Sequence, residues 1–265
     1  MPVLLFINCA SYYLEHFDSK MVAKPGRINI ENGITQGHTE LGFSCNRSFR
    51  DDTVKLSTRN YYDFNKKRVD SSKINERLIL PEQNFSFYAA RLGPHSLSGQ
   101  MELAFAKIGN ELFYDFSAGI GFRFHDENVA GRTFLNFGFM NTSNDVFIFK
   151  TDSSYETVHE YDLIDKYSSS NPFIELTFTL NTTYKSLPAN PFFSLSLKSS
   201  NLFKYNEMKI DLNQFTGSVG LYATVGQITG LAGVQWKYCQ GEKLDHSSPN
   251  LVTQLIFSPG IKKSK

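Results

Sequence analysis

The feature that most constrains the fold of this chain is the alternation of apolar and polar side chains at every second residue. Phe85 and Phe87 alternate with Ser86 and Tyr88, and the same period returns in 101–105, 120–124, 135–139, 174–180 and 193–197. A period of two places successive side chains on opposite faces of a β-strand. The sequence therefore predicts a series of antiparallel strands, each with its apolar face in a core and its polar face in water.

Turn-forming residues separate these alternating runs. Gly93-Pro94, Gly109-Asn110 and Asn171-Pro172 are examples, and no long segment repeats apolar residues at the spacing of a helix. Many short strands with short connections are typical of two sheets that pack face to face. We therefore expect an all-β fold, specifically a two-sheet antiparallel β-sandwich of the jelly-roll kind.

The composition agrees with a sheet protein and excludes one function class. The 265 residues include 24 Phe and 13 Tyr, which suit the half-buried surface of a sheet. Lys and Arg number 27 against 26 Asp and Glu, a formal net charge of +1. With no excess positive charge to attract phosphates, we expect no nucleic-acid partner.

The closing part of the predicted sandwich carries a pattern of glycine and aromatic residues. Residues 215–223 read Phe-Thr-Gly-Ser-Val-Gly-Leu-Tyr-Ala, and residues 234–241 read Val-Gln-Trp-Lys-Tyr-Cys-Gln-Gly. The pattern resembles the closing strands of the concanavalin A-like lectin/glucanase superfamily, of the LamG or jelly-roll type. The resemblance implies a concanavalin A-like fold, which hosts lectins, hydrolases, lyases and interaction modules alike.

The beginning of the chain suggests export. Residues 1–9 read Met-Pro-Val-Leu-Leu-Phe-Ile-Asn-Cys and resemble the end of a bacterial lipoprotein signal, with Cys9 as the residue that receives the lipid. An ordinary buried strand over residues 3–7 is the alternative. We expect a signal remnant or tether in 1–20, a sandwich in 21–241 and a tail or linker in 242–265. The location would be extracytoplasmic, as a cell-envelope lipoprotein or a secreted protein.

Two further features follow from export. No apolar run reaches the roughly 18 residues that a membrane-spanning helix needs, so we expect contact with a membrane only through a lipid anchor. Cys45 and Cys239 lie near the two ends of the predicted sandwich, and an oxidising compartment would allow a disulfide between them. Two unpaired thiols are the alternative.

Polar residues on the outer faces of the predicted strands offer a ligand site. Arg123 and His125 lie on one run, and Tyr88, Glu102 and Asn136 lie on the corresponding sides of three others. Such a set on a concave sheet would hold a sugar by hydrogen bonds and ring stacking. Ordinary solvent-facing residues or cross-strand pairs are the alternative.

Acidic residues give the only catalytic candidates. Glu160, Asp162 and Asp165 resemble the carboxylate motif of retaining glucanases, whose two carboxyl groups flank one bond at about 5 Å. A surface loop is the alternative.

A second acidic group, Asp126, Glu127 and Asn128, carries oxygen ligands of the kind that suits calcium. A solvated turn is the alternative here, and we expect no other cofactor.

The leading hypothesis is therefore an exported, lipid-anchored β-sandwich that binds carbohydrate or another cell-surface ligand without catalysis. A glycoside hydrolase or polysaccharide lyase on the same fold is the first alternative. An accessory domain of a larger secreted enzyme is the second.

Overall fold

The computed structural model describes residues 11–22, 27–32, 38–48, 53–58, 74–93, 96–151, 161–205, 208–240 and 247–259. Within them the regular elements are all strands: β1 (Ser11–Met21), β2 (Thr39–Ser48), β3 (Thr53–Thr58), β4 (Ile74–Ile79), β5 (Gln83–Leu92), β6 (Leu97–Ile108), β7 (Glu111–His125), β8 (Val129–Thr151), β9 (Tyr161–Thr182), β10 (Asn190–Tyr205), β11 (Met208–Val225), β12 (Ile228–Gln240) and β13 (Ser247–Phe257).

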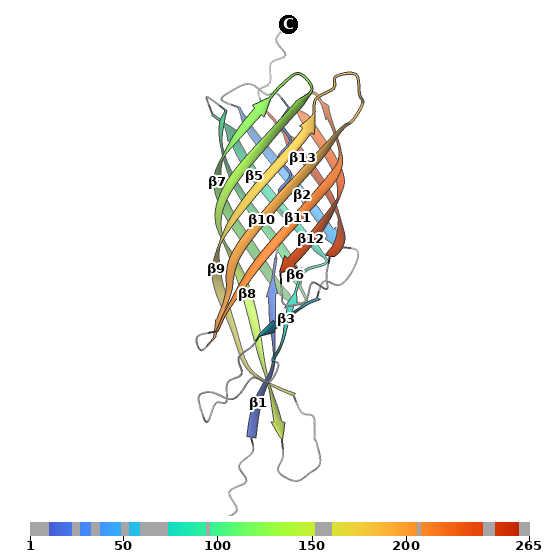
Figure 1. Cartoon of the computed structure of the whole chain (residues 1–265). Coiled ribbons are helices and arrows are strands. Elements are labelled where there is room, and N and C mark those ends of the chain that lie inside the picture. The colour runs from blue at the N-terminus through green and yellow to red at the C-terminus, as the bar shows by residue number, and fades with distance from the viewer. Residues whose placement is uncertain are drawn as a thin grey trace, which may run out of the picture.

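Ten of the described strands form one closed antiparallel barrel (Figure 1). Their order is β8-β7-β6-β5-β2-β13-β12-β11-β10-β9, and β9 pairs again with β8, so the sheet returns to its first strand. Closure removes the free edges that an open sheet would expose. The all-β prediction is confirmed. The two-sheet β-sandwich, the jelly roll and the concanavalin A-like assignment are wrong, because the strands form one continuous wall instead of two stacked layers.

The two ends of the barrel differ. At the short-turn end, which lies at the top of Figure 1, β7 joins β8 through 126–128 and β11 joins β12 through 226–227. At the opposite, extended end, β8 continues past its pairing with β7, and its residues 142–151 pair with β1 instead. β4 lies parallel to β1, and β3 lies beside β4. A small sheet therefore projects from the extended end.

The faces of the barrel strands are the reverse of the predicted ones. Leu176 is 50% exposed and Phe137 is 54% exposed on the outside, whereas the intervening Glu175, Thr177 and Asn136 are at most 1% exposed and face the lumen. Period two was correctly recognised, but it defines two faces without saying which of them is buried. The expected phenylalanine and leucine core is in fact the outer surface.

The closing hairpin and the chain ends also need correction. Residues 215–240, which carry the described part of the lectin-like pattern, belong to β11, β12 and the turn between them. The predicted tether contains most of β1, and the predicted tail contains β13, which pairs with both β12 and β2 and so completes the wall. Cys45 of β2 is a free thiol, and β13 separates β2 from the strand that holds Cys239, so the predicted disulfide is wrong. Cys9 lies outside the described residues.

One inward-facing glycine is required by a close approach. Gly42 pairs with Tyr88 across β2 and β5, and a Cβ at position 42 would overlap the Tyr88 ring. We expect Gly42→Ala to lower the free energy of unfolding by about 1–3 kcal/mol, because the buried ring has to move. Gly217→Ala is the control, since its Cβ would meet nothing nearer than Leu195 Cδ2 at 3.9 Å, and it should change stability by less than about 0.5 kcal/mol. Equal unfolding midpoints for the two variants would contradict the role of Gly42.

Candidate functional site: the occupied lumen

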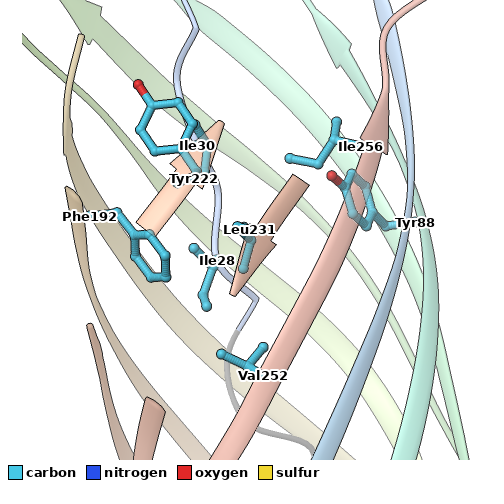
Figure 2. Close-up of a cluster of buried hydrophobic side chains, with 8 residues drawn as sticks. All are labelled: Ile28, Ile30, Tyr88, Phe192, Tyr222, Leu231, Val252 and Ile256. Atoms are coloured by element: carbon cyan, nitrogen blue, oxygen red, sulfur yellow. The ribbon is translucent and has the colours of Figure 1, made fainter. Parts of the chain in front are cut away.

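The lumen of the barrel is occupied by the chain itself. Residues 27–32, here called the lumen segment, follow β1 and precede β2 in the sequence. They lie inside the barrel and do not join its wall (Figure 2). Residues 27–31 are at most 5% exposed, although three of them are polar or charged. A buried extended segment has to satisfy its backbone polar groups without the help of a neighbouring strand.

One side of the lumen segment is apolar. Ile28 and Ile30 each have 1% of their surface exposed and belong to a cluster of buried apolar side chains. Figure 2 shows the side chains that the wall contributes to this cluster: Tyr88, Phe192, Tyr222, Leu231, Val252 and Ile256. The alternate residues of the segment therefore face a matching apolar part of the wall, contributed by β5 and β10 to β13.

Side chains of the wall bind the backbone of the lumen segment. Thr179 Oγ1 accepts a hydrogen bond from the N–H of Asn29 at 3.0 Å, and Gln254 Nε2 donates to the carbonyl of Ile28 at 3.0 Å. The amide of Asn181 accepts from the N–H of Glu31 and donates to its carbonyl, both at 3.0 Å. These contacts replace the ladder that a sheet would provide, so the wall recognises the segment as an extended peptide.

A cluster of buried charges lies in the lumen near the short-turn end. Arg132 donates to Glu40 through both terminal nitrogens, at 2.6 and 2.8 Å, and its Nε donates to Glu31 at 2.7 Å. Arg123 lies 3.8 Å from the second oxygen of Glu31. The side chains of Arg132, Glu31 and Glu40 are each 1% exposed, so these charges depend on one another for solvation.

Arg27 occupies the middle of the lumen. Its guanidinium carbon lies 3.0 Å from the centroid of the Tyr88 ring, and Nη1 donates to Gln100 at 2.8 Å. Gln100 donates in turn to Asn136 at 2.7 Å, and Asn136 donates to Glu175 at 3.4 Å. The hydrogen bonds thus continue from the lumen segment across the wall strands β6, β8 and β9.

Nearer the extended end, side chains of the wall also fill the lumen. Lys198 forms a buried ion pair with Asp115, and its ammonium lies 3.8 Å from the centroid of the Phe173 ring. Just beyond, Val22 packs in a cluster with Phe113, Ala104 and Ala106. A charged group and an apolar cluster therefore follow one another along the described part of the lumen.

Four of the five predicted ligand residues face this lumen. Tyr88, Glu102 and Asn136 are at most 4% exposed, and Arg123 reaches the same space beside Glu31. These four residues lie on one face of the wall, and that face points inward, toward the lumen segment. His125 is exposed at the short-turn end, where it lines a hollow of about 940 Å³ with Glu127 and Asn128. A ligand-binding role for the five residues stays a prediction.

The structure describes the acidic candidates only in part. Asp162 and Asp165 belong to β9, where they pair with β8, so the predicted loop is wrong there, and Glu160 lies outside the described residues. Asp126, Glu127 and Asn128 are exposed in the β7–β8 turn, where Asp126 Oδ1 accepts from the N–H of Glu127 at 2.8 Å. Among the described residues, no group of three or more His, Cys, Asp or Glu side chains is arranged to hold a metal. The catalytic and calcium roles stay predictions.

Sequence reasoning missed the lumen segment and its partners. Arg27-Ile-Asn-Ile-Glu-Asn32 does alternate with period two, but it lies in a polar stretch whose periodicity is otherwise weak. Thr177, Thr179 and Asn181 alternate on β9 as a water-facing strand side would. The alternation is therefore visible in the sequence, but it does not show that residues 27–32 lie inside the barrel or which wall residues they contact.

No known protein family and no curated protein sequence matches this chain. Among solved structures, LpxR from Salmonella typhimurium is similar with a TM-score of 0.36 and 6% identity over 82% of this chain and 99% of that one. The translocator domain of the autotransporter NalP from Neisseria meningitidis has a TM-score of 0.37 and 9% identity over 86% of this chain and 90% of that one. At these values, neither likeness supports a conclusion about function. No helix among the described residues is long and apolar enough to cross a membrane.

Proposed function

We propose that this chain is an integral membrane β-barrel of the outer-membrane type, with a lumen sealed by its own residues 27–32. The observation that carries the proposal is the apolar outer surface. Large apolar side chains are exposed on the barrel strands all the way around, and they include Leu41, Phe87, Met101, Ile120, Phe122, Phe137, Phe139, Ile174, Leu176, Phe193, Leu197, Phe215, Leu221, Trp236, Leu251 and Leu255. A continuous apolar surface of this extent would not be stable in water.

The height of the apolar surface fits a bilayer. On β7 the outward side chains between Leu112, which is 68% exposed, and Phe124, which is 47% exposed, span twelve residue steps. At ~3.3 Å per residue and a strand tilt of about 40°, these steps cover about 30 Å along the barrel axis. The apolar band of membrane barrels is about 25 Å tall and the hydrocarbon core about 30 Å thick.

The closed ring of strands supports the same proposal. A bilayer core offers no hydrogen-bond partners, so a membrane-spanning sheet has to pair all of its backbone, as this ring of strands does. The proposal keeps the expected location in the cell envelope, without the finer assignments made from the sequence. The lipoprotein and soluble secreted forms are corrected, because the barrel wall itself provides the membrane contact, and the carbohydrate-binding sandwich is withdrawn with its fold.

The proposal predicts membrane insertion and a closed pore. Full-length protein reconstituted in phospholipid vesicles should stay with the membrane after alkaline carbonate and urea washes, and planar bilayers should show no steady conductance. In the variant Ile28→Asp with Ile30→Asp, each buried carboxylate costs at least ~2 kcal/mol against the apolar wall, so the two together should raise the open time on the order of 1,000-fold or more.

Ile28→Val with Ile30→Val keeps the apolar contact and is the matched control, which should stay closed. A shift in gel mobility between unheated and heated samples verifies that each variant has folded. Release of the wild-type protein by carbonate would refute membrane insertion, and conductance of the wild type equal to that of the Asp variant would refute the seal.

A further inference from the structure

We propose that the lumen segment carries the chain across the membrane, so that β1 and the sheet at the extended end are displayed on the outer side. Both the start of β2 and the end of β13 would then lie on the inner side. This inference rests on the proposed function, because it needs a membrane around the barrel. It goes further in assigning the barrel the task of threading and displaying its own N-terminal part.

The partners of the chain change in order along the lumen. Val22 packs with Phe113 near the extended end, and Arg27 binds Gln100 in the middle. Asn29 then binds Thr179, and Glu31 binds Asn181 two residues further along β9. At the short-turn end, the carbonyl of His38 accepts from the N–H of Leu92, where β5 ends. The described residues 22, 27–32 and 38 therefore follow one another along the lumen from the extended end to the short-turn end, in the order expected of a single crossing.

This single internal passage separates the ends of the described chain. β1 pairs with residues 142–151 of β8, beyond the reach of β7, and so lies at the extended end. The first barrel strand, β2, starts at Thr39 beside Arg91, and the last strand, β13, ends at Phe257 beside Ile228. Both of these points lie at the short-turn end. Because the wall has ten strands, an even number, the chain enters and leaves the wall at the same end of the barrel. The internal passage then places β1 at the opposite end from the end of β13.

The contacts also prevent the segment from slipping. A shift by one residue would turn Ile28 and Ile30 toward Thr177 and Thr179 and would turn Asn29 toward the apolar wall. A shift by two would restore the faces but would remove Glu31 from Arg132, which leaves buried charge uncompensated. The segment is therefore held at one register as a fixed crossing.

The shape of the two ends assigns the sides. In membrane barrels of bacteria, short turns face the periplasm and the longer connections face the exterior. Here the connections at one end, 93–96, 126–128, 183–189 and 226–227, are all short. The other end has two-residue connections at 109–110 and 206–207, but it also carries the longest connections, 49–82 with β3 and β4, and 152–160, together with β1 and the extensions of β8 and β9 (Figure 1). The geometry thus places the projecting sheet outside the cell, where it is available to external partners.

An epitope-tag experiment in a Gram-negative host tests this arrangement with the full chain. Three separate variants carry the tag ahead of Ser11, in the β6–β7 turn at Gly109, and in the β7–β8 turn at Glu127. Antibody should label the tags ahead of Ser11 and at Gly109 on intact cells. The tag at Glu127 should be labelled only after the outer membrane is permeabilised, with at least about tenfold less signal before, as expected of a continuous bilayer barrier.

The outcomes separate the two proposals. Labelling of the tag ahead of Ser11 together with the tag at Glu127, but not at Gly109, would overturn the threaded path. Labelling at Glu127 alone on intact cells would overturn the assigned sides. Recovery of all three variants in the soluble fraction would instead overturn membrane insertion, and with it the proposed function. The heat-dependent gel shift confirms that each tagged chain has folded before it is scored.

Discussion

Arg132→Met is expected to lower the free energy of unfolding by about 3–5 kcal/mol, because it removes the cation that hydrogen-bonds both buried carboxylates, Glu31 and Glu40. Arg132 donates three hydrogen bonds to Glu31 and Glu40, and all three side chains are 1% exposed. Urea unfolding in vesicles, followed by the emission of the single tryptophan, Trp236, measures the change. Arg91→Met is the control, since Arg91 is exposed and its loss should cost less than about 0.5 kcal/mol.

A triple variant shows whether the charge itself is responsible. When Glu31→Gln and Glu40→Gln accompany Arg132→Met, the two carboxylate charges leave the cluster together with the cation, and although Arg123 loses its ion pair with Glu31, part of the lost stability should return. If the triple variant is no more stable than the single one, the loss reflects the packing of the arginine stem, and the cluster is not an electrostatic closure of the lumen.

The strands were predictable from the sequence, whereas their closure was not. Alternation located the strands over Phe85, Ile120, Leu135 and Ile174, because the pleat repeats every two residues in any sheet. Closure depends on the pairing of β8 with β9 and of β13 with β2, which joins residues far apart in the chain. No local pattern encodes such a pairing, so a sandwich and a barrel share the same signature.

The direction of each face was misread for a related reason. The rule that apolar side chains point inward holds in water, and it was applied to a wall that suits lipid. One clue lay in the polar faces. Those of β9 and β10 carry charge at Glu175 and Lys198. Most of the other described inward residues there, among them Thr177, Thr179, Ser194 and Ser196, are small and uncharged, as suits a narrow lumen, where a water-facing sheet usually carries more charge. Charged residues are only 20% of the chain.

The candidate site depended on that same choice. Once the polar faces are turned inward, Tyr88, Glu102, Arg123 and Asn136 become the lining of an interior space. The sequence shows nothing that would have placed Ile28 and Ile30 within it, because the lumen segment forms no strand pairing and is recognised through side chains far away in the chain.

Leu176→Arg provides the sharpest test of which solvent surrounds the barrel. Leu176 is 50% exposed at mid-height on β9, paired with Leu135 of β8 and Leu197 of β10, so three outward leucines meet there. In a bilayer an arginine at this depth should cost about 2–4 kcal/mol of unfolding free energy.

Val225→Arg is the matched control, because Val225 is 80% exposed beside the β11–β12 turn, and near the interface the same substitution should cost about 0–1 kcal/mol. Both variants are compared with the wild type by urea unfolding in vesicles. A half-exposed leucine in water would accept arginine at little cost. Equal, small effects at the two positions would therefore mean that water surrounds the barrel, whereas a cost that grows from Val225 to Leu176 is the depth dependence that only a hydrocarbon layer imposes.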